Sequence, residues 1–126
     1  MRCLILCTAT FAALTSHAQI GNNLNLLDPN LAERNELLAL PNITDQLADA
    51  VIAARPISST SELDIVVSAI LNEEQRTELY GQLFRQIDLN SATEVEIMLI
   101  PGMTSRMTHE FEEYRPYTSL EQFRRE

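Results

Sequence analysis

The turn Pro101-Gly102-Met103-Thr104 has the residue types that best fit binding chemistry in this 126-residue chain. An apolar run ends at Ile100, and a helical pattern resumes by Ser105. The first amides of a helix have no hydrogen-bond acceptor within the helix itself. Together with the positive end of the helix dipole, such amides favour an anion, most often a phosphate. The residue types at this turn therefore favour a phosphate site.

Other groupings of reactive residues fit a catalytic or metal site less well. His109-Glu110 begins like a zinc-protease helix, but position 113 holds Glu where the second histidine ligand is needed. In the stretch EFEEY (110–114), Phe111 and Tyr114 are predicted to face inward, which turns the acids toward water. The neighbouring methionines are likewise predicted to fill the core: Met98, Met103 and Met107. We expect no catalytic residues, no metal site, no cofactor and no enzymatic activity.

Residues 1–18 have the features of a secretory signal. Arg2 supplies a positive charge, an apolar stretch runs from Cys3 to Leu14, and small residues follow at Ser16-His17-Ala18. This pattern predicts cleavage before Gln19 and a periplasmic or secreted protein; an N-terminal anchor or tail is the alternative. The apolar stretch is too short to span a bilayer, so we expect no membrane contact after cleavage. Both cysteines would leave with the signal.

The predicted mature chain is strongly acidic and contains no lysine. Arg2 would leave with the signal, so 8 arginines remain against 18 acidic residues, a net charge of −10. A charge of this sign repels nucleic acid at long range instead of steering it toward the protein. The composition therefore opposes the phosphate site that the Pro-Gly turn suggests.

The chain repeats itself with an offset of 60 residues. Residues 28–59 align without gaps on residues 88–119. The identical pairs are Asp28/Asp88, Asn30/Asn90, Ala32/Ala92, Glu36/Glu96, Pro41/Pro101, Thr44/Thr104, Arg55/Arg115, Pro56/Pro116 and Ser59/Ser119. Apolar positions agree as well. A match of this length without gaps indicates an internal duplication.

Each copy is predicted to contain two helices joined by a tight turn. Asn30 and Asn90 are expected to cap the first helix, which runs to Leu40 or Ile100 and ends at the following proline.

The second helix of each copy is expected to begin at Thr44 or Thr104. Its apolar positions, 47, 51 and 54 in one copy and 107, 111 and 114 in the other, have the spacing of a core-facing helix. Proline ends each helix directly after Arg55 or Arg115. These two arginines are predicted to cap their helices, and contact with a ligand is the alternative.

Residues 59–84 predict two further helices. Asn72 caps the second of them, supported by Gln75 three residues on, and Leu79, Leu83 and Phe84 form its apolar stripe. No segment after Phe123 corresponds to this last helix, so the second copy is expected to be truncated.

The whole pattern predicts an all-α fold of duplicated units. The expected divisions are residues 1–18 (signal), 19–27 (lead-in), 28–84 (first unit with two following helices) and 85–126 (second unit). Without a covering helix, Leu120 and Phe123 are expected to pack back on the first copy or to stay partly exposed.

The pattern of the second copy resembles a known family. DLNSATEVEIMLIPGM (88–103) is similar to the helix-hairpin-helix motif and to the opening of secreted competence DNA-receptor (ComEA-like) domains, with its Asn-x-Ala-Thr-x-x-Glu run before the hairpin. Residues 25–84 cover such a domain from end to end, and the second copy covers about two-thirds of one.

The resemblance implies a specific set of phosphate-binding residues. In that family the hairpin amides hold a DNA phosphate, sometimes with a metal cation on the hairpin carbonyls. The matching positions are Gly102, Met103, Thr104, Ser105 and Arg106. Glycine lets the backbone approach the phosphate closely, but Thr104 replaces the family's second glycine.

The first hairpin departs further from the family. Asn42 and Thr44 replace both glycines, and the acidic Asp45 follows where a phosphate would lie. Asn tolerates positive φ, so the turn can form. We therefore predict a structural role for this hairpin, without phosphate binding.

Two functions follow from these observations. The first is a secreted or periplasmic module that binds double-stranded DNA weakly and without sequence specificity through the second hairpin. The alternative is a non-enzymatic helical module that has lost DNA binding and contacts an unknown protein partner. Some helix-hairpin-helix glycosylases use a catalytic lysine, which this chain lacks.

Overall fold

The computed structural model describes residues 26–125; the predicted signal, the first part of the lead-in and residue 126 lie outside the described residues. Within this range the chain forms seven helices, and its only bridge of β type is the isolated pair Leu27 and Leu83. The helices are α1 (Arg34–Leu38), α2 (Asp45–Ala53), α3 (Thr60–Ser68), α4 (Glu73–Tyr80), α5 (Glu94–Met98), α6 (Ser105–Glu113) and α7 (Leu120–Arg125). The predicted all-α fold is confirmed.

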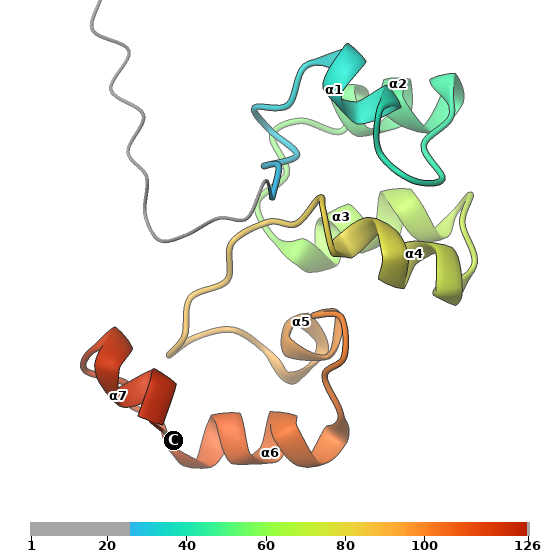
Figure 1. The fold of residues 1–126 in the computed structure, drawn as a ribbon. Helices are drawn as coiled ribbons and strands as arrows, with labels where there is room; N and C mark the ends of the chain where they lie inside the picture. The colour runs from blue at the N-terminus through green and yellow to red at the C-terminus, as the bar shows by residue number, and fades with distance from the viewer. Residues whose placement is uncertain (1–25, 126) are drawn as a thin grey trace, which may run out of the picture.

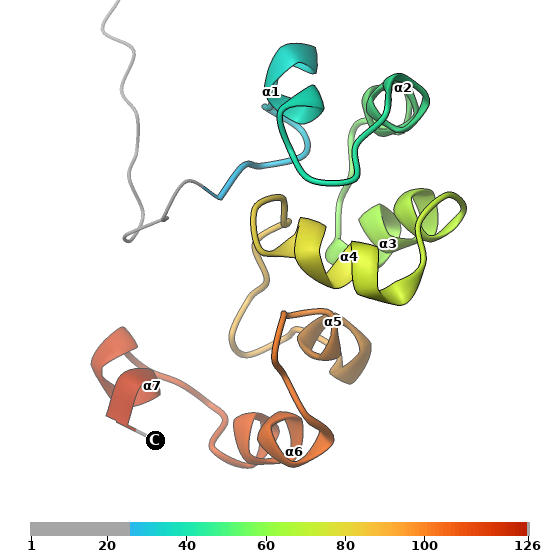
Figure 2. The same cartoon turned by 45° about the vertical axis from the view of Figure 1, so that its right-hand side comes forward.

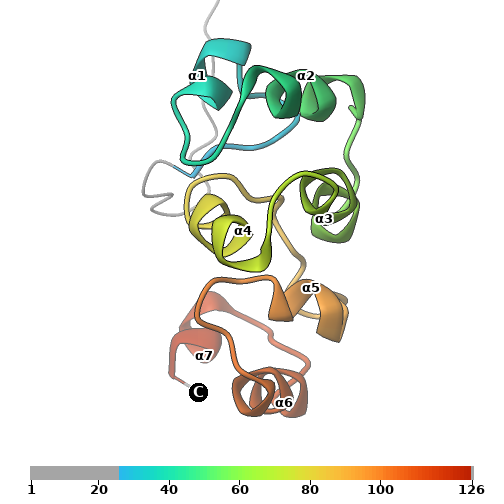
Figure 3. The ribbon, with the colours of Figure 1, turned by 90° about the vertical axis from the view of Figure 1, so that its right-hand side faces the viewer.

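The helices follow one another along a single direction. α1 and α2 lie at one end, α3 and α4 occupy the middle, α5 comes next, and α6 and α7 lie at the far end (Figures 1 and 3). The view in Figure 2 shows the same order, with α5 between α4 and α6.

Threonine caps define the start of the second helix in each copy. Thr44 accepts a hydrogen bond from the Leu47 amide, and Thr104 accepts one from the Met107 amide, each at 3.3 Å. These starts agree with the prediction, and proline lies in the break before each cap. The first helices are shorter than predicted, because α1 ends at Leu38 and α5 at Met98.

Asn30 and Asn90 do not cap helices, contrary to the prediction. The cap positions are Glu33 and Thr93, three residues later. The Asn30 amide group instead bridges the backbone of Ile57: Nδ2 donates to the carbonyl at 2.8 Å, and Oδ1 accepts from the amide at 2.8 Å. Asn90 makes the same pair of bonds to Tyr117, at 3.0 and 2.7 Å. Each asparagine thus joins the start of a copy to its end.

Arg55 and Arg115 have structural roles, but with partners other than those predicted. Arg55 donates from Nε and Nη2 to the carbonyls of Pro29 and Ala32, at 2.7 and 2.6 Å. Sixty residues later, Arg115 donates to the corresponding carbonyls of Leu89 and Ala92. Each guanidinium therefore holds the turn that precedes the first helix of its copy.

The first core is built from α1 to α4 and the segment after α4. Its fully buried side chains include Leu37, Leu47, Val51, Leu63, Val67, Leu79 and Leu83. The lead-in joins this core through the Leu27 backbone, which bonds to Gln82 and Phe84. An ion pair of 2.7 Å between Arg85 and Asp28 closes the same region.

The second core is smaller and is continuous with the first. Ala92, Ile97, Phe111 and Tyr117 form its buried set. Ile87 and Ile100 pack against both cores, and α5 contacts α3. The described region is therefore held together across the predicted boundary at residue 85.

No helix within residues 26–125 combines the length and the apolar character needed to cross a membrane.

Candidate functional site

The second hairpin has the backbone of a type II turn. Gly102 has φ of +83° in the third position of the turn, and the Met103 amide donates to the Ile100 carbonyl at 3.0 Å. Pro101 and Gly102 are exposed, and a Cβ added at Gly102 would meet no atom within 4 Å. The turn therefore stands open to a ligand, and its backbone angle favours glycine.

Three of the predicted phosphate-binding residues offer open amides. Among the hydrogen bonds formed within residues 26–125, none uses the backbone N–H of Thr104, Ser105 or Arg106. All three residues are exposed at the start of α6. Met103 is a correction to the predicted set, because its amide is already bonded inside the turn. The candidate anion site is thus the amides of residues 104–106, positioned by Gly102.

The side chain of Arg106 does not lie free beside these amides. Its Nε donates to Oε1 of Glu110 at 2.9 Å, one helical turn further along α6. The arginine side chain is 87% exposed and the glutamate 46%, and an ion pair so exposed stabilises the protein little. A phosphate can therefore compete for the guanidinium, although Glu110 keeps a negative charge close by.

A groove of about 240 Å³ separates the second hairpin from α4. The hairpin side of it includes Gly102 and Met103, and the α4 side includes Glu73, Arg76 and Thr77. Arg76 adds no free charge here, because its Nη1 is bonded to Asp64 at 2.6 Å. The α4 side of this groove therefore contributes the Glu73 carboxylate and no free cation.

Most arginines of the described region are occupied by other protein groups. The engaged side chains are Arg34, Arg55, Arg76, Arg85, Arg106 and Arg115, each bonded to a carboxylate or to backbone carbonyls. Arg125 also has a partner. Cations are therefore not gathered into a phosphate-binding surface.

The first hairpin also passes through a residue of positive φ, but in a different chemical setting. Asn42 takes the position of Gly102 with φ of +61°, as the sequence suggested it could. Its Nδ2 donates to Oε2 of Glu78 on α4 at 2.9 Å. Three residues after Asn42, Asp45 at the start of α2 forms an ion pair with Arg34 at 2.7 Å. This hairpin is thus tied to α4 and lies among carboxylates.

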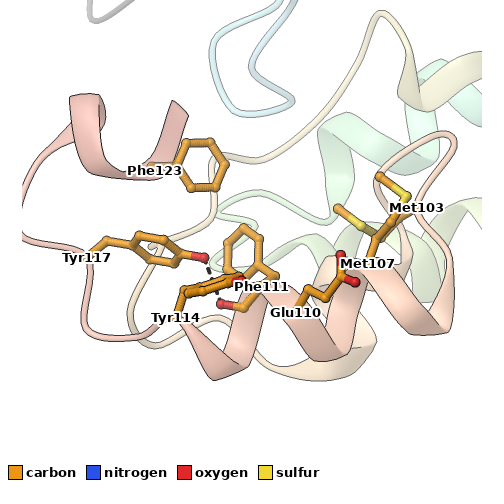
Figure 4. A pocket seen from close by; sticks show the side chains of 7 residues that line it. All are labelled: Met103, Met107, Glu110, Phe111, Tyr114, Tyr117 and Phe123. Carbon is orange, nitrogen blue, oxygen red and sulfur yellow. Dashed lines mark hydrogen bonds between the residues drawn. The ribbon is translucent and has the colours of Figure 1, made fainter. Parts of the chain in front are cut away.

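An apolar groove on the second copy was not predicted. Its volume is about 230 Å³, and its lining residues are Met103, Met107, Glu110, Phe111, Tyr114, Tyr117 and Phe123 (Figure 4). Met98, Met107 and Tyr114 were expected in the core but are 40, 47 and 43% exposed. The predicted burial of these three residues is therefore wrong, because helical spacing identifies an apolar face but not the segment that covers it.

Three rings form the floor of this groove. Phe111, Tyr117 and Phe123 meet edge to face, with ring centroids 5.2 to 5.6 Å apart. The Tyr117 hydroxyl donates to the Phe111 carbonyl at 2.9 Å (Figure 4). Phe123 therefore packs within the second copy rather than against the first, whereas Leu120 is 52% exposed. The three rings therefore form the floor of the groove, and the partly exposed Met107 and Tyr114 lie at its edge.

His109 is exposed on α6, and Glu113 is exposed on the same helix. Within the described part of the chain, no group of three or more His, Asp or Glu side chains is arranged to hold a metal ion.

Comparison of the chain with protein-family models, curated proteins and solved structures gives no match.

Proposed function

We propose that this chain is a non-enzymatic helix-hairpin-helix module that binds a phosphate of double-stranded DNA weakly and without sequence specificity. The observation that carries the proposal is the open backbone at residues 104–106. These amides lie at the exposed start of α6, behind a turn in which Gly102 provides the required positive φ.

The proposed binding is weak for an electrostatic reason. The whole chain has a net charge of −9, and Arg106, which carries one of the open amides, is already paired with Glu110. A site that neutralises one or two phosphates has a shallow salt dependence. The logarithm of the binding constant should fall with the logarithm of the salt concentration with a slope of magnitude about 1 to 2.

The test is a fluorescence titration of labelled duplex with the predicted mature chain, residues 19–126, at roughly 20 and 150 mM salt, a range over which phosphate contacts weaken. Arg106→Glu should abolish binding because it places a carboxylate beside the amides. Arg124→Glu changes the charge equally on the exposed surface of α7 and should weaken binding much less. Asn42→Gly in the first hairpin should leave binding unchanged.

Two outcomes would refute the proposal. Absence of binding at low salt would exclude DNA as a ligand. Binding that responds equally to Arg106→Glu and Arg124→Glu would place the contact on another surface.

A second candidate function is a helical protein-interaction module. The observation that favours it is the apolar groove of the second copy, whose partly exposed methionine and aromatic side chains are typical of protein-binding surfaces. This function requires no phosphate contact.

Both proposals place the mature protein in the periplasm or outside the cell. This location rests on the Arg2 charge, the apolar stretch and Ser16-His17-Ala18. Mass spectrometry of protein isolated from its native cell should give an N-terminus near Gln19. Intact residues 1–18 on that protein would contradict the location.

A further inference from the structure

We infer that the apolar groove of the second copy is the surface through which two copies of this chain associate as a weak two-fold dimer. The inference rests on the second candidate function, which it deepens by naming the partner, and it does not depend on DNA binding. It is carried by the distribution of charge along the chain and by the residues in which the second copy differs from the first.

The negative charge of the chain is concentrated in one part of it. Residues 26–102 contain four arginines and 13 acidic residues, a net charge of −9. Residues 103–126 contain four arginines and five glutamates, a net charge of −1. Two copies that approach each other through the first part are therefore strongly repelled, whereas two copies that approach through the second part are not.

The nearly neutral part lies at one end of the molecule. α6 and α7 are at the opposite end from α1 and α2, with α3 and α4 between them (Figures 1 and 3). A dimer formed end to end through α6 and α7 thus keeps the acidic parts of the two copies apart. Since charges at physiological salt are screened over about 8 Å, this separation removes most of the repulsion.

The second copy has larger side chains at the groove than the first copy has at the corresponding positions. Tyr114 corresponds to Ala54, and Glu110 corresponds to Ala50. Ala54 is exposed, so the repeated unit does not require an aromatic ring at this position. Tyr114 is nevertheless 43% exposed at the edge of the groove. A contact outside the copy itself accounts for a ring placed there.

The shape of the groove suits a second copy of the same surface. Its floor consists of Phe111, Tyr117 and Phe123, and the partly exposed Met107 and Tyr114 lie at its edge (Figure 4). A two-fold axis brings the same surface of both copies together. The edge of each copy can then cover the aromatic floor of the other.

Both signs of charge are found next to the groove. Glu110 lines it, the ion-pair partner Arg106 is 87% exposed, and Arg124 is exposed on α7. A surface that carries both signs is complementary to its own copy, because opposite charges can face each other across the axis. A strongly basic partner would instead be attracted to the acidic residues within 26–102.

The experiment is sedimentation velocity of residues 19–126 from about 10 μM to about 1 mM, the range of a weak association. We expect the sedimentation coefficient to rise with concentration as a monomer–dimer equilibrium requires. Raising the salt concentration from roughly 20 to 500 mM should tighten the dimer, because salt screens the repulsion between two acidic copies.

Variants of the protein locate the interface. Tyr114→Ala and Met107→Gln should each weaken the dimer about ten-fold or more, since each lost contact occurs twice in a two-fold interface. Tyr114→Ala introduces the residue that the first copy has at the equivalent position, so the fold should tolerate it. Ile65→Gln is the matched control, because Ile65 is 71% exposed on α3, outside the groove. This control should dimerise like the unmodified chain.

The outcomes separate this inference from both proposed functions. A chain that stays monomeric throughout this concentration range would overturn the inference. Equal dimerisation of the chain and all three variants would place the contact on another surface and would overturn it as well. Either result leaves the DNA titration unaffected and leaves the second candidate function to a different protein partner. Loss of DNA binding with a retained dimer would refute only the DNA proposal.

Discussion

Individual polar side chains close each copy on itself. Asn30 and Asn90 lie where a helix cap was expected, yet they bond to backbone groups 27 residues further along the chain. Local sequence predicted a hydrogen-bonding residue at these positions but not its partner, because the same asparagine side chain fits a cap or a distant backbone. The arginines before the two cis prolines also bond to backbone carbonyls at the start of their own copy.

The Asn30 bridge should contribute measurably to stability. Asn30→Ala would leave both the amide and the carbonyl of the buried Ile57 without their partners. An unpaired buried polar group costs about 1 to 3 kcal/mol, so the free energy of unfolding should fall by at least that amount. Chemical denaturation measures the change. Asn35→Ala, at an exposed position of α1, is the control, and an equal effect of both substitutions would contradict the role of the bridge.

Asp88 should make the stability of the protein depend on acidic pH. Its carboxylate accepts hydrogen bonds from the Asn90 and Ser91 amides, and these bonds lower its pKa below the ordinary value. A lowered pKa stabilises the fold above the unfolded-state pKa of about 4, and this contribution is lost as the pH falls through the folded-state value. Melting temperatures between pH 6 and pH 2 should therefore fall less steeply for Asp88→Asn. Glu113→Gln is the control, because it removes the same charge from the surface of α6. If this variant reduced the fall in melting temperature equally, the hydrogen bonds of Asp88 would not be the cause of the pH dependence.

At the scale of helices and turns, the sequence correctly predicted the features that depend only on residues close together in the chain. Proline breaks, the Thr44 and Thr104 caps and the Asn72–Gln75 capping box are all present. Burial at Met107 and Tyr114 was predicted wrongly because it depends on which segment packs against α6. The spacing of apolar residues identifies a helix face, but it does not identify the covering element.

The two hairpin turns should tolerate the same residues. Gly102→Val forces a β-branched residue into a left-handed backbone, which costs about 1 to 2 kcal/mol in the free energy of unfolding. Gly102→Asn should cost much less, since Asn42 adopts the corresponding conformation with φ of +61°. Thermal denaturation of both variants measures this difference. Equal destabilisation by Asn and Val would show that the space around Gly102, rather than its backbone angle, is limiting.

Across the whole molecule, the two candidate functions use neighbouring surfaces of α6, because Glu110 lines the apolar groove and also pairs with Arg106. The open amides lie at the N-terminal end of α6, and the groove extends along the side of α6 toward α7 (Figure 4). Ile87 and Ile100 join the two copies into a continuous core. The sequence repeat located the hairpins, but the open groove became evident only from the burial of equivalent residues.

For the proposed DNA binding, the ion pair between Arg106 and Glu110 should limit the affinity more than the net charge does. Glu110→Gln removes one negative charge and releases Arg106 from its ion pair. DNA binding should tighten, and the magnitude of the log–log salt slope should increase by up to about 1, because the freed guanidinium can contact a phosphate. Glu113→Gln changes the net charge equally but leaves the Arg106–Glu110 pair in place. Parallel salt titrations of the two variants therefore separate a local cation from overall repulsion. If both variants bind DNA equally more tightly, long-range repulsion limits binding, and Arg106 is not held back by Glu110.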